Sequence, residues 1–75
     1  MSEYNDVKRD YLYLESLDID ADQVEIDSEV FDLMANPTKK RAAAMYKSAI
    51  VFWFEGIRNS QIKDDRVEEI RKRYL

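Results

Sequence analysis

The most specific chemical pattern in this sequence is a run of spaced carboxylates between residues 18 and 29. Asp18, Asp20 and Asp22 alternate with other residues, and Glu29 closes the run. Carboxylate oxygens are hard ligands that suit a divalent cation such as calcium. The spacing therefore raises the hypothesis of a metal site formed by Asp18, Asp20, Asp22 and Glu29.

This spacing resembles the calcium-binding loop of the EF-hand family. The four carboxylates stand at positions 1, 3, 5 and 12 of a twelve-residue loop over residues 18–29, where that family places oxygen ligands. The loop departs from the family pattern at Gln23, where the sharp turn needs glycine, and at Glu25, which replaces an apolar residue. The resemblance implies a single helix–loop–helix hand with calcium as its cofactor.

The same residues also suit an acidic connection that binds no metal. Aspartate is common in turns because its side chain bonds to the nearby backbone. Val24 and Ile26 alternate with polar residues, which predicts a short extended piece over residues 23–27. Under this interpretation we expect no cofactor.

Residue types on which most enzymes depend are missing from the chain. It has no histidine and no cysteine, which removes the commonest general base, the commonest metal ligand and the thiolate nucleophile. Its single glycine cannot build a phosphate-binding loop. We therefore expect a protein that is not an enzyme and acts by binding.

Charge is distributed unevenly along the 75 residues. The net charge is −4, yet residues 1–37 hold eleven acids and two bases, whereas residues 38–75 hold ten bases and five acids. We expect the two halves to fold against each other, and the alternative is a protein with one acidic and one basic surface.

One long helix over about residues 37–58 must position most of the binding residues. An Asn-Pro pair at residues 36–37 is a favourable helix start, and three alanines follow closely. The helix is apolar over most of its circumference, which indicates a central position in the domain or pairing with another chain. Ala42, Ala49 and Gly56 fall on one line, so a homodimer through this helix is the alternative to ordinary core packing.

Further helices are expected on both sides of it. Apolar spacing predicts a helix over residues 3–17 that Ser2 caps, and another that begins after Asp64 or Asp65. Residues 1–75 are therefore predicted to form a single all-α domain, a small bundle of three to four helices.

A short helix over residues 28–35 is predicted between the acidic segment and the long helix. Val30, Phe31 and Met34 are expected to face inward from it, because residues three and four apart share one helix face.

The leading functional hypothesis is a small non-enzymatic protein-interaction module, such as a regulator, inhibitor or assembly factor. Aromatic side chains with flanking charges suit contact with a protein partner. The basic cluster of residues 39–41 opposes the dipole of its own helix, so its positions favour contact with an acidic surface. The partner-binding candidates are Lys39, Lys40, Arg41, Tyr11 and Trp53.

The alternative is a helix-turn-helix-like nucleic-acid binder that uses the basic C-terminal half. Lys63, Arg66, Arg71 and Arg73 would then face phosphates. The negative net charge opposes this reading, so nucleic acid is the less favoured partner.

The location is expected to be cytoplasmic, without a membrane span. The first residues, MSEYNDVKRDY, are polar and acidic, unlike a signal peptide. The longest unbroken apolar segment, Ala49 to Phe54, is far below the roughly 20 residues that a spanning helix needs.

Overall fold

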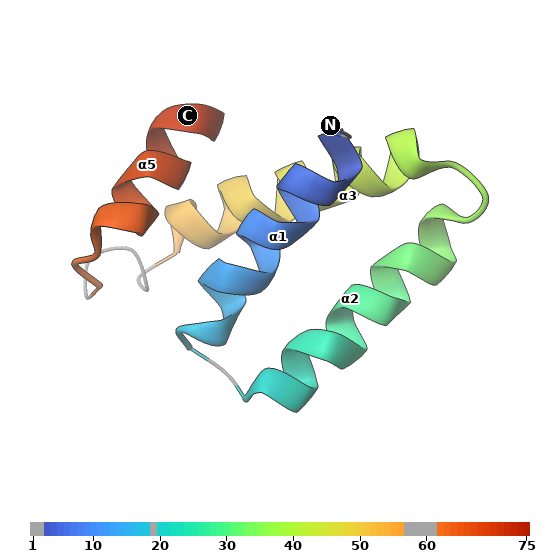
Figure 1. The fold of residues 1–75 in the computed structure, drawn as a ribbon, viewed down its shortest axis with the longest axis horizontal. Helices are drawn as coiled ribbons and strands as arrows, with labels where there is room; N and C mark the ends of the chain where they lie inside the picture. The colour runs from blue at the N-terminus through green and yellow to red at the C-terminus, as the bar shows by residue number, and fades with distance from the viewer. Residues whose placement is uncertain (1–2, 19, 57–61) are drawn as a thin grey trace.

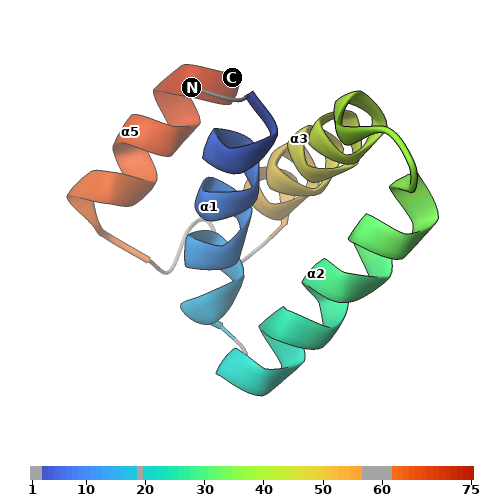
Figure 2. The same cartoon turned by 45° about the vertical axis from the view of Figure 1, so that its right-hand side comes forward.

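The computed structural model describes residues 3–18, 20–56 and 62–75, and these residues form four α-helices without a strand. The helices are α1 (Glu3–Ser16), α2 (Ala21–Ala35), α3 (Lys39–Glu55) and α5 (Asp65–Tyr74). α1 packs across α3, and α2 and α5 lie on opposite sides of α1 (Figures 1 and 2). The prediction of an all-α helical bundle is confirmed.

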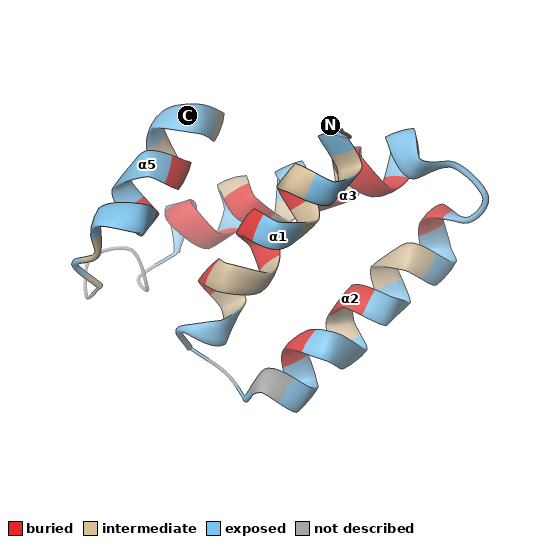
Figure 3. Ribbon diagram, in the orientation of Figure 1, coloured by how far each residue is buried: buried red, intermediate tan, exposed pale blue. Residues whose placement is uncertain are grey.

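The core lies mainly between α1 and α3, the pair of helices with the most extensive contact. Each buries one face, because residues three and four apart fall on one line of a helix. On α1 the buried residues are Val7, Asp10, Tyr11 and Leu14. On α3 they are Ala42, Ala43, Tyr46, Ile50, Trp53 and Phe54. The buried faces of the helices turn toward one another (Figure 3), and the predicted central position of the long helix is confirmed.

The start of α3 differs from the predicted one. Thr38 is its N-cap and Lys39 its first residue, whereas the sequence predicts Asn36 as the cap. The reason is that Asn36 is the C-cap of α2, and the backbone N–H groups of Asn36 and Thr38 donate to the carbonyl oxygens of Leu33 and Ala35 at 3.3 and 2.9 Å. The turn between the two helices therefore uses the residues that were predicted to begin α3.

Two predicted helix ends fall on residues outside the described ranges. They are the cap at Ser2 and the end of the long helix at Arg58. Among the described residues α1 spans Glu3–Ser16, close to the predicted 3–17. The last residue of α3 is Glu55, with Gly56 as its C-cap.

α2 shows the largest departure from prediction. It begins at Ala21 instead of Ser28, so the segment 23–27 is helical and the predicted extended piece is wrong. The physical reason lies in the period of burial. Val24, Ser28 and Ala35 are buried at helical spacing, whereas the residues between them are mostly exposed. Alternation of apolar and polar residues over only five positions did not distinguish a strand from a helix.

α2 also turns a different face inward from the predicted one. Val30 and Met34, which were expected to be buried, are 46% and 60% exposed, and only Phe31 of the three is partly buried. The inward face instead carries Ser28 and Asp32, whose polar atoms find partners on the other helices.

A polar cluster fixes this orientation by joining α1, α2 and α3. The fully buried hydroxyl of Tyr46 lies 2.9 Å from Oδ1 of Asp32 and 3.0 Å from the carbonyl oxygen of Ser28. From α1, the Tyr4 hydroxyl donates to Asp32 at 2.7 Å and the Lys8 ammonium at 2.8 Å. A buried polar group without a partner costs about 1–3 kcal/mol, so the cluster favours the observed face of α2.

Hydrogen bonds join α5 to α1 at both ends of α5. At the start, Asp64 caps the helix as predicted and also accepts a hydrogen bond from the Tyr13 hydroxyl at 2.7 Å. At the end, Arg73 and Tyr74 donate to Oδ2 of the buried Asp10, each at 2.6 Å. These contacts join the acidic half of the chain to the basic half, as the charge distribution predicts.

Replacing Tyr46 with phenylalanine tests the polar cluster. We expect Tyr46→Phe to lower the free energy of unfolding by about 1–2 kcal/mol, because the buried Ser28 carbonyl and the partly buried Asp32 carboxylate lose the hydroxyl that they share. Tyr13→Phe is the matched control, since its hydroxyl bonds to an aspartate at the less buried start of α5. Urea unfolding measures both variants. A loss at Tyr46 no larger than that at Tyr13 would contradict the assignment.

The stability that Asp32 provides should depend on pH. Burial raises the pKa of Asp32, but hydrogen bonds from Lys8, Tyr4 and Tyr46 outweigh it and hold this pKa below its ordinary value of 3.8. A carboxyl group whose pKa is lower in the folded state than in the unfolded state stabilises the protein at pH values above the unfolded-state pKa. This stabilisation is lost as the pH falls through the folded-state pKa.

We therefore expect the free energy of unfolding of the wild type to be higher than that of Asp32→Asn. The difference between the two should be largest and constant above about pH 5, and should shrink as the pH falls toward about 2. Urea unfolding at a series of pH values measures this difference. A difference that stays constant across the series would show that the ionised carboxylate is not what the cluster requires.

Candidate functional site

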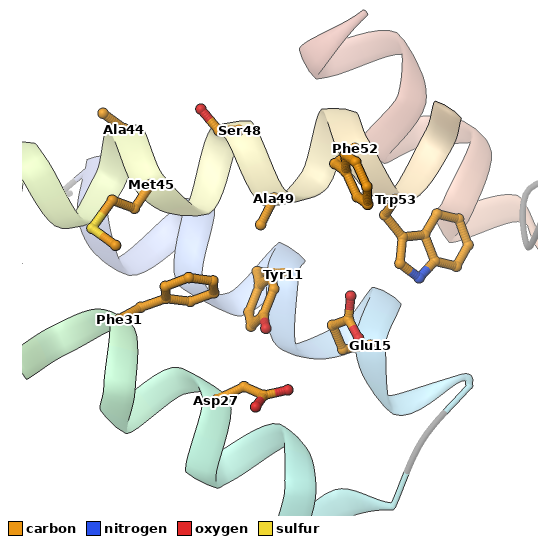
Figure 4. A pocket seen from close by; sticks show the side chains of 10 residues that line it. All are labelled: Tyr11, Glu15, Asp27, Phe31, Ala44, Met45, Ser48, Ala49, Phe52 and Trp53. Atoms are coloured by element: carbon orange, nitrogen blue, oxygen red, sulfur yellow. The ribbon is translucent and has the colours of Figure 1, made fainter. Parts of the chain in front are cut away.

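An open groove with a volume of about 700 Å³ runs between α1, α2 and α3 (Figure 4). Its lining is mostly aromatic and aliphatic. α1 contributes Tyr11 and Glu15, α2 contributes Asp27 and Phe31, and α3 contributes Ala44, Met45, Ser48, Ala49, Phe52 and Trp53.

α3 supplies the apolar wall of the groove because it is apolar on more than its core-facing side. Met45, Ala49 and Phe52 stand four and three residues apart, so they follow one line along the helix. Met45 and Ala49 are partly buried, whereas Phe52 is 76% exposed. The groove therefore presents a large aromatic side chain to solvent at one edge.

Two aromatic rings form a packed floor. Tyr11 and Phe31 meet edge to face with their ring centroids 5.3 Å apart, and both rings pack against Tyr46, at 5.2 and 5.4 Å. Tyr46 is held by the polar cluster, so its ring cannot easily move. The floor is therefore in place before anything binds.

Trp53 brings an unused hydrogen-bond donor to the groove. The side chain is almost fully buried and packs edge to face against Phe54, with ring centroids 5.1 Å apart. Within the described part of the chain its indole Nε1 has no acceptor. In Figure 4 this nitrogen lies on the side of the ring nearer Glu15. A buried, unpaired donor of this kind costs about 1–3 kcal/mol.

The charged groups that line the groove are all negative. They are the carboxylates of Glu15 and Asp27, and none of the described residues that line the groove is a cation. Asp27 also accepts a hydrogen bond of 3.1 Å from the amide of Gln23, one turn earlier on α2. The groove therefore favours an apolar occupant that is neutral or positively charged.

The structure divides the predicted partner-binding residues into two places. Tyr11 and Trp53 come together as lining of the groove. Lys39, Lys40 and Arg41 are exposed in the first turn of α3, at the opposite end of the helix from Trp53. The basic cluster therefore does not belong to the groove, and its contact with an acidic partner stays a prediction.

Residues 18–29 do not have the conformation of a calcium-binding loop, because most of these residues belong to α2, and calcium binding by them stays a prediction. Asp18 lies in the turn before the helix, Asp20 is its N-cap, and Asp22 and Glu29 lie within it. Seven residues of helix advance about 10.5 Å, too far for two carboxylates to hold one calcium at ligand distances of about 2.4 Å. Among the described residues, no group of three or more acids forms a metal site.

Three of the four basic residues proposed to contact nucleic acid are engaged inside the protein. Arg73 donates to Asp10. The guanidinium groups of Arg66 and Arg71 lie over aromatic rings, 4.2 and 5.0 Å from the ring centroids. Lys63 is the remaining candidate, and residues 57–61 before it lie outside the described ranges. These contacts disfavour a phosphate-binding face on α5.

Sequence reasoning missed the contributions of Phe31 and Phe52 to the site. The signal for Phe52 was present, because it shares a helix line with Met45 and Ala49. The position of Phe31 at the groove depends on which face of α2 turns inward, and that is decided by contacts distant in sequence.

Comparison of the chain with known protein families, curated proteins and solved structures gave no match. None of the helices in the described ranges is long and apolar enough to cross a membrane. A functional proposal therefore depends on the chemistry of the surface itself.

Proposed function

We propose that this protein is a non-enzymatic protein-interaction module, a regulator, inhibitor or assembly factor, that binds an apolar segment of a partner in the groove between α1, α2 and α3. Phe52 carries the proposal, because it is 76% exposed at the edge of an aromatic groove. Exposed aromatic side chains beside preformed apolar pockets are typical of the residues that dominate binding energy.

The composition of the groove supports a protein partner. Aromatic residues and methionine are enriched at protein–protein interfaces, and Tyr11, Phe31, Met45, Phe52 and Trp53 all line this groove. The groove is open along its length, which suits a row of side chains from a helix or extended segment. The cytoplasmic location stays a prediction.

The alternative of a homodimer through α3 is less well supported. Its small-residue line needs Ala42, Ala49 and Gly56 to be accessible together. Ala42 is buried in the core against the other helices. A second chain therefore cannot approach α3 closely along the full line.

Fluorescence of Trp53 provides a direct test, because it is the only tryptophan in the chain. The probe is a synthetic, tryptophan-free helical peptide of leucine, alanine and glutamine, with leucines three and four residues apart on one face. We expect its addition to change the Trp53 emission saturably. Phe52→Ser should weaken this binding by about tenfold or more, because an exposed phenylalanine would no longer be buried on binding.

Leu75→Ser is the matched control, since Leu75 is also an exposed apolar residue but lies outside the groove. It should leave the affinity unchanged, and both variants should melt like wild type. An emission that does not saturate with peptide, or equal weakening by the two substitutions, would count against the groove as the binding site.

A further inference from the structure

α2 carries a second apolar face that points away from the core. Four of its residues form what we call the outer strip: Ile26, Val30, Leu33 and Met34, which are 52%, 46%, 75% and 60% exposed. Spacings of three and four residues place them side by side along the helix. Contiguous apolar surface of this kind is rarely left exposed without a binding role.

Carboxylates border the outer strip along one side. Asp22, Glu25 and Glu29 are exposed at spacings of three and four residues, so they share a face next to the strip. In the part of the chain that the structure describes, no ion pair involves them. α2 as a whole has five acids and no base. The acidic spacing that resembles a calcium loop in the sequence is therefore the charged border of an apolar helix face.

We propose that the outer strip binds an amphipathic helix of another protein whose apolar face is flanked by lysine or arginine. Leucine-type side chains of that helix would pack between Ile26, Val30 and Leu33. Its cations would lie over the carboxylates of Glu25 and Glu29, where opposite charge sets the orientation of the two helices. This surface is separate from the groove and does not depend on the function proposed for it.

A second copy of this chain fits the outer strip less well. Each α2 carries five acids and no base, so pairing two α2 helices would bring like charges to one interface, which is destabilising. The basic helix α5 cannot serve, because its apolar residues Val67 and Ile70 are buried against the rest of the protein. The same carboxylates repel an anionic lipid surface. A basic helix from a different protein satisfies both the apolar strip and its border.

The test uses isotope-labelled full-length protein and two synthetic helical peptides that share one leucine pattern. One peptide has lysines beside the leucines and the other has glutamates. We expect the lysine peptide to shift the backbone amide signals of Ile26, Val30, Leu33 and Met34 saturably and more than those of Asp27 and Phe31, which line the groove, with an affinity that falls as salt rises. The glutamate peptide should cause no saturable shift.

Two sets of variants separate the apolar and charged contributions. Val30→Ser combined with Leu33→Ser should lower the affinity for the lysine peptide by about tenfold or more. Glu25→Gln combined with Glu29→Gln, which removes charge while keeping the side-chain shape, should lower the affinity severalfold and weaken its salt dependence. Phe52→Ser, at the groove, should leave binding to the strip unchanged.

Several results would overturn the proposal. These are equal binding of the two peptides, no saturable shift at Ile26, Val30, Leu33 and Met34, and unchanged affinity in both double variants. Shifts of α2 amides on dilution without peptide would assign the strip to a second copy of this chain. Lysine-peptide shifts confined to the Trp53 indole would overturn this proposal while leaving the groove as a binding site.

Discussion

The hydroxyl of Tyr46 is the group on which the arrangement of α2 depends. It is fully buried and reaches both the Asp32 carboxylate and the Ser28 carbonyl, at 2.9 and 3.0 Å. Burial raises the pKa of Tyr46 to about 12, so the hydroxyl keeps its proton and remains a donor at neutral pH. A donor in this position requires acceptors, and the face of α2 that carries Ser28 and Asp32 supplies them. Because the face with Ser28 and Asp32 turns inward to accept from Tyr46, the more apolar face of α2 remains exposed.

Both candidate binding surfaces follow from this one constraint. With Ser28 and Asp32 turned inward, Phe31 covers the rings of Tyr11 and Tyr46 and becomes the floor of the groove. With the same rotation, the outer strip faces solvent beside its row of carboxylates. A helix that contributes to a small core with one side and exposes apolar residues on the other is expected where a partner completes the packing.

The sequence predicted the elements whose signals are local. Helical spacing in residues 3–17, the cap at Asp64 and the broad apolar surface of the long helix all correspond to observed features. α2 was predicted poorly because its acids matched the spacing of a calcium loop. Its buried face also contains Ser28 and Asp32, which look like surface residues until their partner Tyr46 is known.

The candidate site was also predicted only where its signals are local. Tyr11 and Trp53 could be chosen because large aromatic residues on a predicted central helix and its neighbour tend to meet. The orientation of Phe31 could not be predicted, because it depends on hydrogen bonds between residues that are 14 and 18 positions apart in the sequence. Local patterns contain no information on such pairs.

Two valines of α2 provide the most direct measurement of this orientation. Val24 is 3% exposed and Val30 is 46% exposed, so the same truncation probes opposite faces of one helix. We expect Val24→Ala to lower the free energy of unfolding by about 2 kcal/mol and Val30→Ala to change it by less than about 0.5 kcal/mol. A larger loss at Val30 than at Val24 would mean that α2 buries its apolar face, and would contradict the role assigned to Tyr46.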